Sequence, residues 1–450
     1  MVRKTLLFGT LGLLVALATA ALYARSRGAL IPGLGGEAVG AVVDQAIAGD
    51  STAVATLAFD RCRLLRHKTK QTCYEEILLG MVGKSAVRLA MDGLSVLARM
   101  DPETVRNGHD LAHVVGINAW APGKDIDAVY TTCTALYQSG CYHGVVQAYL
   151  DAKGTDSSTV YDLCHQIKVT ATDMWLRFQC VHGIGHGLVN ALNHHLPKAL
   201  QGCDQLVDSW DAQSCYGGAF MEFIVEGRGQ AHHPHTHHPA QPAQVAVAAG
   251  EHDHGDHGAG KPDPGTAADS FPIRDKTDPL YPCTAIDTKY QFGCYGMQAG
   301  IIIEMTGPDF GKIARACDEA PDSMKASCYQ GIGTYVSGYT VRSPEKSIQL
   351  CAKGNDRLQA WCYIGVVKNF IDVTSNPDDG FGFCRRFTDR NYSVACYNAV
   401  GEEMAVLYRA PSDREQQCAK LPAEDAAACR FGAGLGGTRP KELSFLSPAA

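Results

Sequence analysis

Eighteen cysteines, arranged as nine close pairs, constrain the fold of this 450-residue chain more than any other feature. In seven of the nine pairs the two cysteines stand eleven or twelve positions apart. After Cys294 the second cysteine of each pair recurs at 328, 362, 396 and 429, a period of about 34 that is typical of a repeat protein. The pairs stand at positions 62/73, 133/141, 164/180, 203/215, 283/294, 317/328, 351/362, 384/396 and 418/429.

One repeat has no cysteines. The interval from Cys73 to Cys141 is twice the period, so this repeat should centre on Asn107. Its first cysteine would be expected eleven positions earlier, where Val96 stands, so both cysteines are missing together. A bond confined to each repeat explains this joint absence, and we therefore predict nine disulfides, each within one pair.

Around each second cysteine the sequence has the pattern of an amphipathic helix. Counted from that cysteine as zero, apolar residues favour positions +1, +4, +5 and +8, which share one helical face. A shorter helix, such as the one expected over 344–351, precedes it and carries the first cysteine. We predict an all-α fold, an α-solenoid of about ten disulfide-stapled helical hairpins with a 34-residue period. Glycine is frequent at position +3, which predicts close approach of a neighbouring helix, because glycine inside a helix costs about 1 kcal/mol relative to alanine.

The pattern divides the chain into six segments. Arg3 and Lys4 precede an apolar run, which is typical of an export signal and is long enough to span a bilayer if it is not cleaved. The predicted segments are a signal peptide or N-terminal anchor (1–24), an N-terminal linker (25–56), repeats one to five (57–226), a disordered histidine-rich insertion (227–282), repeats six to ten (283–437) and a C-terminal tail (438–450).

Export and composition narrow the classes of function. Disulfides persist in oxidising compartments, so we expect a periplasmic or extracellular protein that meets a membrane only through an uncleaved N-terminal segment. The formal net charge of −7 argues against nucleic-acid binding, which needs a clustered basic surface. The chain has no Gly-x-Ser-x-Gly and every cysteine has a partner, so a nucleophilic hydrolase lacks a candidate residue.

The insertion is rich in histidine, with eight of the chain's 17 histidines between positions 232 and 257. Its Pro, Ala, Gly and His composition cannot bury a core, and in composition alone it resembles the histidine-rich loops of periplasmic zinc-binding proteins. Neutral imidazoles at this density bind Zn, Cu or Ni, so we predict a metal buffer; a solvated low-complexity loop is the alternative. These histidines are His232, His233, His235, His237, His238, His252, His254 and His257.

Five other histidines recur at two positions of three consecutive repeats. His109 and His113 fall at +2 and +6 of repeat two, His143 at +2 of repeat three, and His182 and His186 at +2 and +6 of repeat four. Residues four apart share a helical face, and equivalent positions of adjacent hairpins lie side by side. We therefore predict one patch of five imidazoles, away from the apolar face of their own hairpins.

The chemistry of this patch points to a transition metal. Zinc would take three or four of the histidines, and copper or nickel suits the same donors. Neighbouring positions supply Met221 and Glu75 as further candidate ligands, and Glu222 as a candidate general base. Iron or non-covalently bound haem is less expected, and the chain has no Cys-x-x-Cys-His for covalent c-type haem.

Three functions follow from these features. The first is an exported protein that binds Zn, Cu or Ni in the five-histidine patch, with the histidine-rich loop as buffer. The second is a metal-dependent enzyme, a hydrolase or an oxidoreductase, that uses the same histidines. The third is a metal-free scaffold that binds a protein partner on the concave surface of its repeats. We favour binding over catalysis, because the sequence indicates no substrate pocket.

Overall fold

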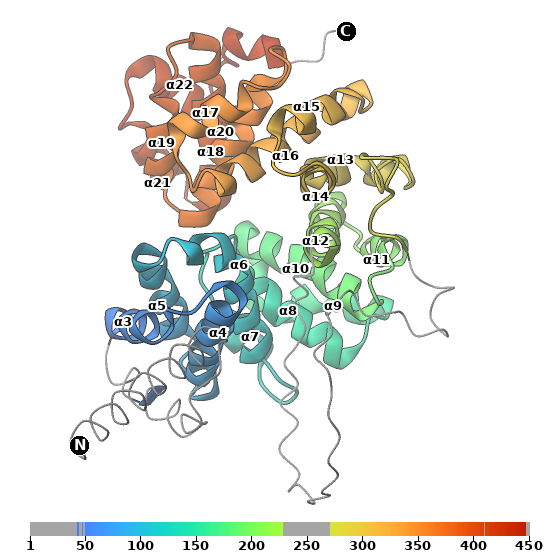
Figure 1. The fold of residues 1–450 in the computed structure, drawn as a ribbon, viewed down its shortest axis with the longest axis vertical. Helices are drawn as coiled ribbons and strands as arrows, with labels where there is room; N and C mark the ends of the chain where they lie inside the picture. Colours follow the sequence, from blue (N-terminus) through green and yellow to red (C-terminus); the bar gives the residue numbers. More distant parts are fainter. Residues whose placement is uncertain (1–42, 45–46, 48–49, 228–270, 409, 447–450) are drawn as a thin grey trace, which may run out of the picture. The chain divides into compact units, whose positions relative to one another are not determined.

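The computed structural model describes residues 43–44, 47, 50–227, 271–408 and 410–446. Over these residues the chain is all-helical and has no strand, as predicted (Figure 1). It divides into two compact units, one that ends at Leu111 and one that begins at Ala112, and the boundary falls inside one helix. The predicted signal segment (1–24) and the eight loop histidines lie outside the described residues. No described helix is long and apolar enough to cross a bilayer.

The first unit consists of two consecutive helical hairpins. Its helices are α3 (Ser51–Cys62), α4 (His67–Gly83), α5 (Val87–Met100) and the first part of α6 (Glu103–Ala119). Helix α3 begins before the predicted boundary at residue 57, because the Asp50 carboxylate accepts hydrogen bonds from the first backbone N–H groups of the helix. The hairpin without cysteines is tied to its neighbour by Asp101, which accepts from the Tyr74 hydroxyl at 2.9 Å and from Lys70 at 3.1 Å.

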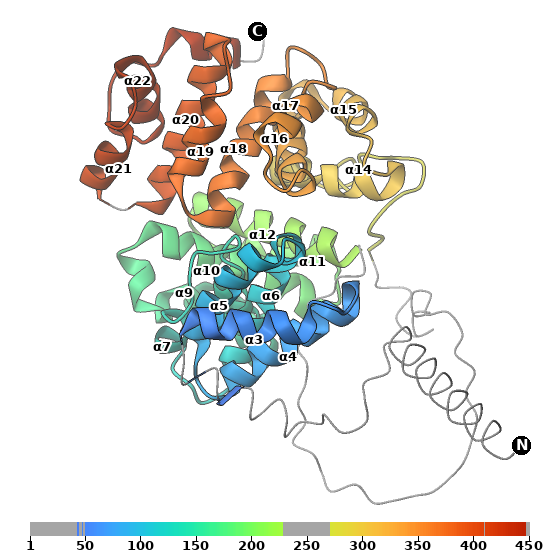
Figure 2. The ribbon, with the colours of Figure 1, turned by 60° about the vertical axis from the view of Figure 1, so that its left-hand side comes forward.

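The second unit continues the alternation of shorter and longer helices. Its helices are α7 (Ile126–Tyr130), α8 (Gly140–Lys153), α9 (Ser157–Gln166), α10 (Met174–Ala191), α11 (Leu196–Cys203), α12 (Ser209–Gly227), α13 (Thr288–Met297), α14 (Ala299–Thr306), α15 (Phe310–Asp318), α16 (Asp322–Tyr339), α17 (Pro344–Cys351), α18 (Gln359–Thr374), α19 (Pro377–Cys384), α20 (Arg390–Leu407), α21 (Pro411–Cys418) and α22 (Ala423–Gly432), with 3-10 helices η1 (Lys168–Ala171) and η2 (Lys441–Leu446). Longer helices that follow one another in the chain pack side by side, as α16, α18 and α20 do (Figure 2).

All nine predicted disulfides are present, and together they use all eighteen cysteines. In seven hairpins the bond joins a shorter helix to the longer helix that follows it. The exceptions are Cys133 and Cys283, which lie in connecting segments rather than in helices. The predicted staple within each hairpin is therefore confirmed, while the predicted shorter helix does not carry the first cysteine in these two hairpins.

Local sequence explains where these helices start. Helices α17, α19 and α21 each have eight residues, from a proline to the first cysteine of a pair. Proline suits the first turn because that N–H has no partner within the helix. Longer helices such as α10 and α20 begin after Asp173 and Asp389, whose carboxylates accept hydrogen bonds from backbone N–H groups of the first turn.

Pairs of longer helices come into backbone contact at reciprocal glycines. A Cβ atom on Gly218 of α12 would lie 1.9 Å from the carbonyl oxygen of His182 in α10. A Cβ atom on Gly185 of α10 would lie 2.1 Å from the carbonyl oxygen of Cys215 in α12. Because any larger residue would separate the backbones, the predicted role of glycine in close packing is correct here. We call such helices glycine-paired, and the glycines are Gly116 and Gly144 (α6/α8), Gly185 and Gly218 (α10/α12), Gly333 and Gly365 (α16/α18), and Gly401 and Gly432 (α20/α22).

This contact corrects the register of the repeat without cysteines. Gly144 approaches the carbonyl oxygen of His113 just as Gly218 approaches that of His182. His113 therefore stands at position +2, and the cysteine position corresponds to Leu111 rather than to the predicted residue 107. The interval from Cys73 to Cys141 is thus divided unequally rather than into two equal halves, and no cysteine is present in this repeat to reveal the difference in the sequence.

The C-terminal end of the predicted insertion packs on the helices, so the boundary at residue 282 is wrong. The ring of Phe271 lies 6.0 Å from that of Phe223 and 5.7 Å from that of Tyr281. The side-chain amide of Gln298 donates hydrogen bonds to the carbonyl groups of Pro279 and Tyr281. Phe271 and Tyr281 supply aromatic side chains at this end, whereas the sequence from 232 to 257 contains no Phe, Trp or Tyr.

The predicted C-terminal tail also includes a packed element. Helix η2 lies within it and packs against α20. Leu443 is buried, and the Phe445 ring lies 6.2 Å from that of Tyr392. The repeats are therefore followed by a short cap rather than by a segment that makes no contacts.

Deletion of residues 228–270, with a glycine–serine linker in their place, is expected to change Tm by less than about 3 °C. Asp204 holds the helices on both sides of the deletion together, since it accepts from Tyr216 of α12 and from Lys289 and Tyr290 of α13. Circular dichroism melts measure the effect. A deletion extended to residue 282 should lower Tm clearly more, because it removes Phe271; equal effects of the two deletions would contradict this prediction.

Candidate metal centre

Four longer helices bring buried polar side chains to one place in the second unit. Helix α6 carries His113, α8 carries His143, α10 carries His182 and His186, and α12 carries Glu222. The exposed fraction is 0% for His113, His186 and Glu222, 2% for His143 and 7% for His182. The glycine pairs of α6/α8 and α10/α12 hold these helices close enough for short polar side chains to meet.

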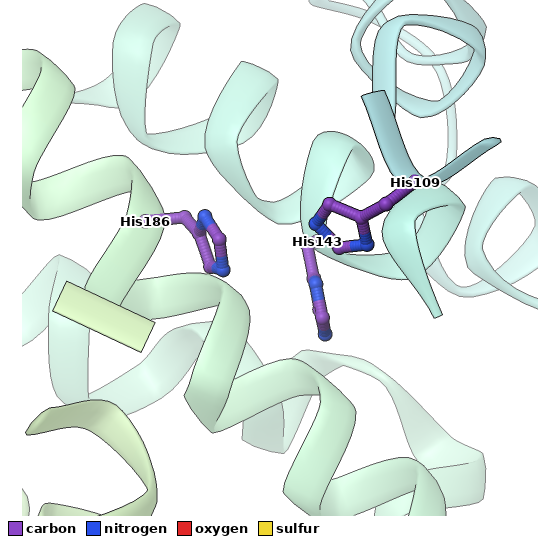
Figure 3. Close-up of side chains that lie close together, drawn as sticks. All are labelled: His109, His143 and His186. Carbon is purple, nitrogen blue, oxygen red and sulfur yellow. The ribbon is translucent and has the colours of Figure 1, made fainter. Parts of the chain in front are cut away.

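The imidazole rings form a compact cluster. The ring of His143 lies 5.0 Å from that of His186, nearly parallel to it, and 4.8 Å from that of His182. The ring of His113 lies 5.2 Å from that of His186 and 6.4 Å from that of His143. Figure 3 shows His143 and His186 extending from their helices, with His109 labelled on α6. The rings of His113, His143 and His186, from three helices, therefore lie within 6.4 Å of one another.

Three of these side chains have the spacing of metal ligands. One ligand atom from each of His113, His186 and Glu222 lies within 4.8 Å of the other two. Ligand atoms around a tetrahedral zinc ion are about 3.3 Å apart when the bonds are roughly 2.0–2.1 Å long. Small rotations of buried rings would close this difference, so the donor set fits a transition metal.

A chain of hydrogen bonds orients His186. Its Nδ1 atom lies 2.7 Å from Oε2 of Glu222, and the Asn190 amide donates to Oε1 of the same carboxylate at 2.9 Å. With its proton on Nδ1 and no metal bound, His186 donates to Glu222. A metal ion that takes the place of this proton would be held by both the imidazole and the carboxylate.

A second hydrogen bond orients His143, whose Nε2 atom lies 3.0 Å from Oε1 of Gln179. If Nε2 is the protonated nitrogen, it donates to this amide oxygen, and Nδ1 is the nitrogen that can bind a metal. Gln179 and Asn190 are functional residues that the sequence analysis did not single out. Both lie one turn from a histidine on the same face of α10, and this spacing is the only signal that could have indicated them.

The electrostatic surroundings favour a cation. Asp151, on α8, is exposed, yet the protein around it displaces enough water to raise its pKa to about 6, and the Glu222 carboxylate adds to the shift. A cation bound at Glu222 would offset this repulsion between the two carboxylates.

The other predicted ligands are placed less directly. His109 lies one helical turn before His113 on α6, in the part of that helix that belongs to the first unit. Glu75 lies on α4 of the first unit, where it accepts a hydrogen bond from Gln71 at 3.1 Å. Met221 is half-buried on α12, and it is the next residue, Glu222, that contacts His186.

No protein-family model, curated protein or solved structure matches this chain. The buried histidine cluster and its carboxylate therefore provide the basis for a functional assignment.

Proposed function

We propose that this protein is an exported helical-repeat protein that binds a transition metal ion, Zn, Cu or Ni, in the cluster of His113, His143, His182 and His186 with Glu222. The observation that carries the proposal is the group of His113, His186 and Glu222. These are three fully buried ligands from three different helices, with ligand atoms within 4.8 Å of one another. Such a convergence of buried titratable groups is typical of functional sites.

The donor types support the choice of metal. Imidazole nitrogens with one carboxylate suit Zn, Cu and Ni, whereas all eighteen cysteines are in disulfides and supply no thiolate. His109 extends the same face of α6 by one turn and is the next candidate ligand. The eight loop histidines, outside the described residues, would deliver or buffer the same ions.

The proposal includes the compartment and the repeat architecture. Nine disulfides indicate an oxidising environment, and the charged and apolar N-terminal pattern supports export. Successive hairpins pack on their neighbours in the second unit, which supports an α-solenoid with a 34-residue period.

Burial supports metal binding rather than turnover. Catalytic zinc sites keep one coordination position open to water and substrate, whereas sites closed by protein ligands are structural. The ligands of this cluster are almost completely buried. Glu222 is fully buried and engaged with His186 and Asn190, so it suits the role of a metal ligand better than that of a general base.

Elemental analysis of the purified protein lacking residues 228–270 tests the proposal. After dialysis against Zn, Cu or Ni, we expect about one equivalent of tightly bound metal, which the double substitution His113→Ala and His186→Ala should remove. His165→Ala is the matched control, because this histidine is exposed on α9 and bonds to the backbone carbonyl of Tyr161. Absence of metal from the parent protein under all three conditions would refute the proposal.

A further inference from the structure

The second unit contains two sets of longer helices that correspond to each other. The first set is α6, α8, α10 and α12, and the second is α16, α18, α20 and α22. In each set the first two helices and the last two are glycine-paired. The glycines in α8, α12, α18 and α22 approach carbonyl oxygens of equivalent residues, namely His113, His182, Gln330 and Asn398. The two sets can therefore be aligned residue by residue.

This alignment identifies what replaces the histidines in the second set. Gln147 of α8 and Lys368 of α18 both stand at position +6 from their cysteine. His186 of α10 and Glu402 of α20 do the same. These four positions lie at equivalent interfaces, between α8 and α10 in the first set and between α18 and α20 in the second.

An ammonium group connects the helices at that interface in the second set. Lys368 Nζ of α18 lies 2.9 Å from Oε2 of Glu402 and 3.4 Å from Oε1 of Glu403, both on α20. Asn398 donates to the Glu402 carboxylate at 2.8 Å. Burial alone would lower the pKa of Lys368, but Glu403 and Glu402 outweigh it and raise the pKa above its ordinary value. The half-buried Lys368 ammonium therefore joins α18 to α20.

The first set has different chemistry at the same place. Gln147 and His186 are both fully buried, and an amide stands where the second set has its ammonium. The Glu222 carboxylate is fully buried beside His186. A buried carboxylate is stable only when charge or hydrogen bonds compensate for lost hydration, and a cation does so most strongly.

We infer that the metal ion is a structural brace, meaning a cation that links neighbouring helices. In the first helix set it would do what the Lys368 ammonium does in the second. This inference rests on the proposed metal binding. His113, His143, His186 and Glu222 come from four different helices, so one ion bound among them would link α6, α8, α10 and α12. Because such a site forms only when the helices are assembled, the binding free energy contributes directly to folding.

Melting curves and hydrogen exchange of the full-length, disulfide-intact protein test this inference. The protein is stripped with a chelator, and one portion is reloaded with zinc. We expect zinc to raise Tm by about 5 °C or more and to slow amide exchange in α8, α10 and α12, with little change in α18 and α20. The double substitution His113→Ala and His186→Ala should abolish both effects.

Lys368→Gln is the matched variant in the second set. This substitution should lower Tm equally in the zinc-loaded and the stripped protein, because the Lys368–Glu402 ion pair that it removes does not depend on metal. A Tm unchanged by Lys368→Gln would contradict the correspondence between the two sets.

The outcomes separate this inference from the proposed function. Zinc binding that requires His113 and His186 yet changes neither Tm nor amide exchange would refute the structural role of the metal. That result would leave the proposed metal binding intact. Absence of Zn, Cu and Ni alike from the cluster would overturn both.

Discussion

Reduction of the nine disulfides is expected to lower Tm by more than about 20 °C, so that the reduced protein is largely unfolded where the oxidised protein is folded. The bonds join cysteines with sequence separations from 8 to 16, and a loop of this size contributes roughly 3 kcal/mol by restricting the unfolded chain. Nine such contributions exceed the roughly 5–15 kcal/mol by which most domains are stable. The shorter helices, of which several have eight residues, are too short to persist without the bond.

Circular dichroism melts with and without a phosphine reductant measure this effect, with thiol titration in denaturant as the control. The oxidised protein should show no reactive thiol, and the reduced protein should show all eighteen. A small change in Tm despite complete reduction would mean that packing alone holds the hairpins. A thiol that reacts before reduction would contradict the pairing.

The covalent framework was predictable from sequence because it is local. Each bond joins residues close in the chain, so the spacing of cysteines reveals both the pairing and the hairpin. The predicted register is wrong in the repeat that has no cysteines, because no cysteine spacing is available there. In that repeat Leu111, rather than residue 107, occupies the cysteine position. The packing of Phe271 and Leu443 was also not predicted, because it depends on helices distant in sequence.

The candidate site was predictable in part for the same reason. The repeat period placed His143 and His182 at equivalent positions, with His186 one helical turn after His182, and the structure brings their rings together. Glu222 was expected next to the ligand position at Met221, whereas the crossing of α10 and α12 turns Glu222 itself toward His186. Side-chain contacts between hairpins depend on crossing angles, which a repeat period does not specify.

The alternation of helix contacts could not be predicted from a 34-residue period. Glycine at position +3 is visible in many repeats, but its reciprocal partner, such as Gly185 or Gly401, is present in only four of the described interfaces, α6/α8, α10/α12, α16/α18 and α20/α22. Within each helix set the reciprocal contact therefore occurs at the first and third interfaces but not at the second. This arrangement places the histidine cluster between the glycine pairs of α6/α8 and α10/α12, and it allows the comparison with Lys368.

Gly218→Ala is expected to destabilise the protein by about 3 kcal/mol and to release the metal. The new Cβ atom would lie 1.9 Å from the backbone carbonyl oxygen of His182, which cannot rotate away, so α10 and α12 must separate. These helices carry His186 and Glu222, whose 2.7 Å contact would be lost. Chemical denaturation measures the stability, and elemental analysis of the folded variant well below its Tm measures the metal.

Alanine substitutions at two other glycines serve as controls, and they distinguish an effect on stability from an effect on metal binding. Gly365→Ala makes an equivalent 1.9 Å contact with the carbonyl oxygen of Gln330 in the second helix set, so it should destabilise the protein similarly but retain the metal. Gly338→Ala meets no atom within 4 Å and should be neutral or stabilise α16 by up to about 1 kcal/mol. Full metal content in Gly218→Ala would show that the site does not need the close approach of α10 and α12. Equal metal loss in Gly365→Ala would show that the metal responds to global stability rather than to the geometry of its own helices.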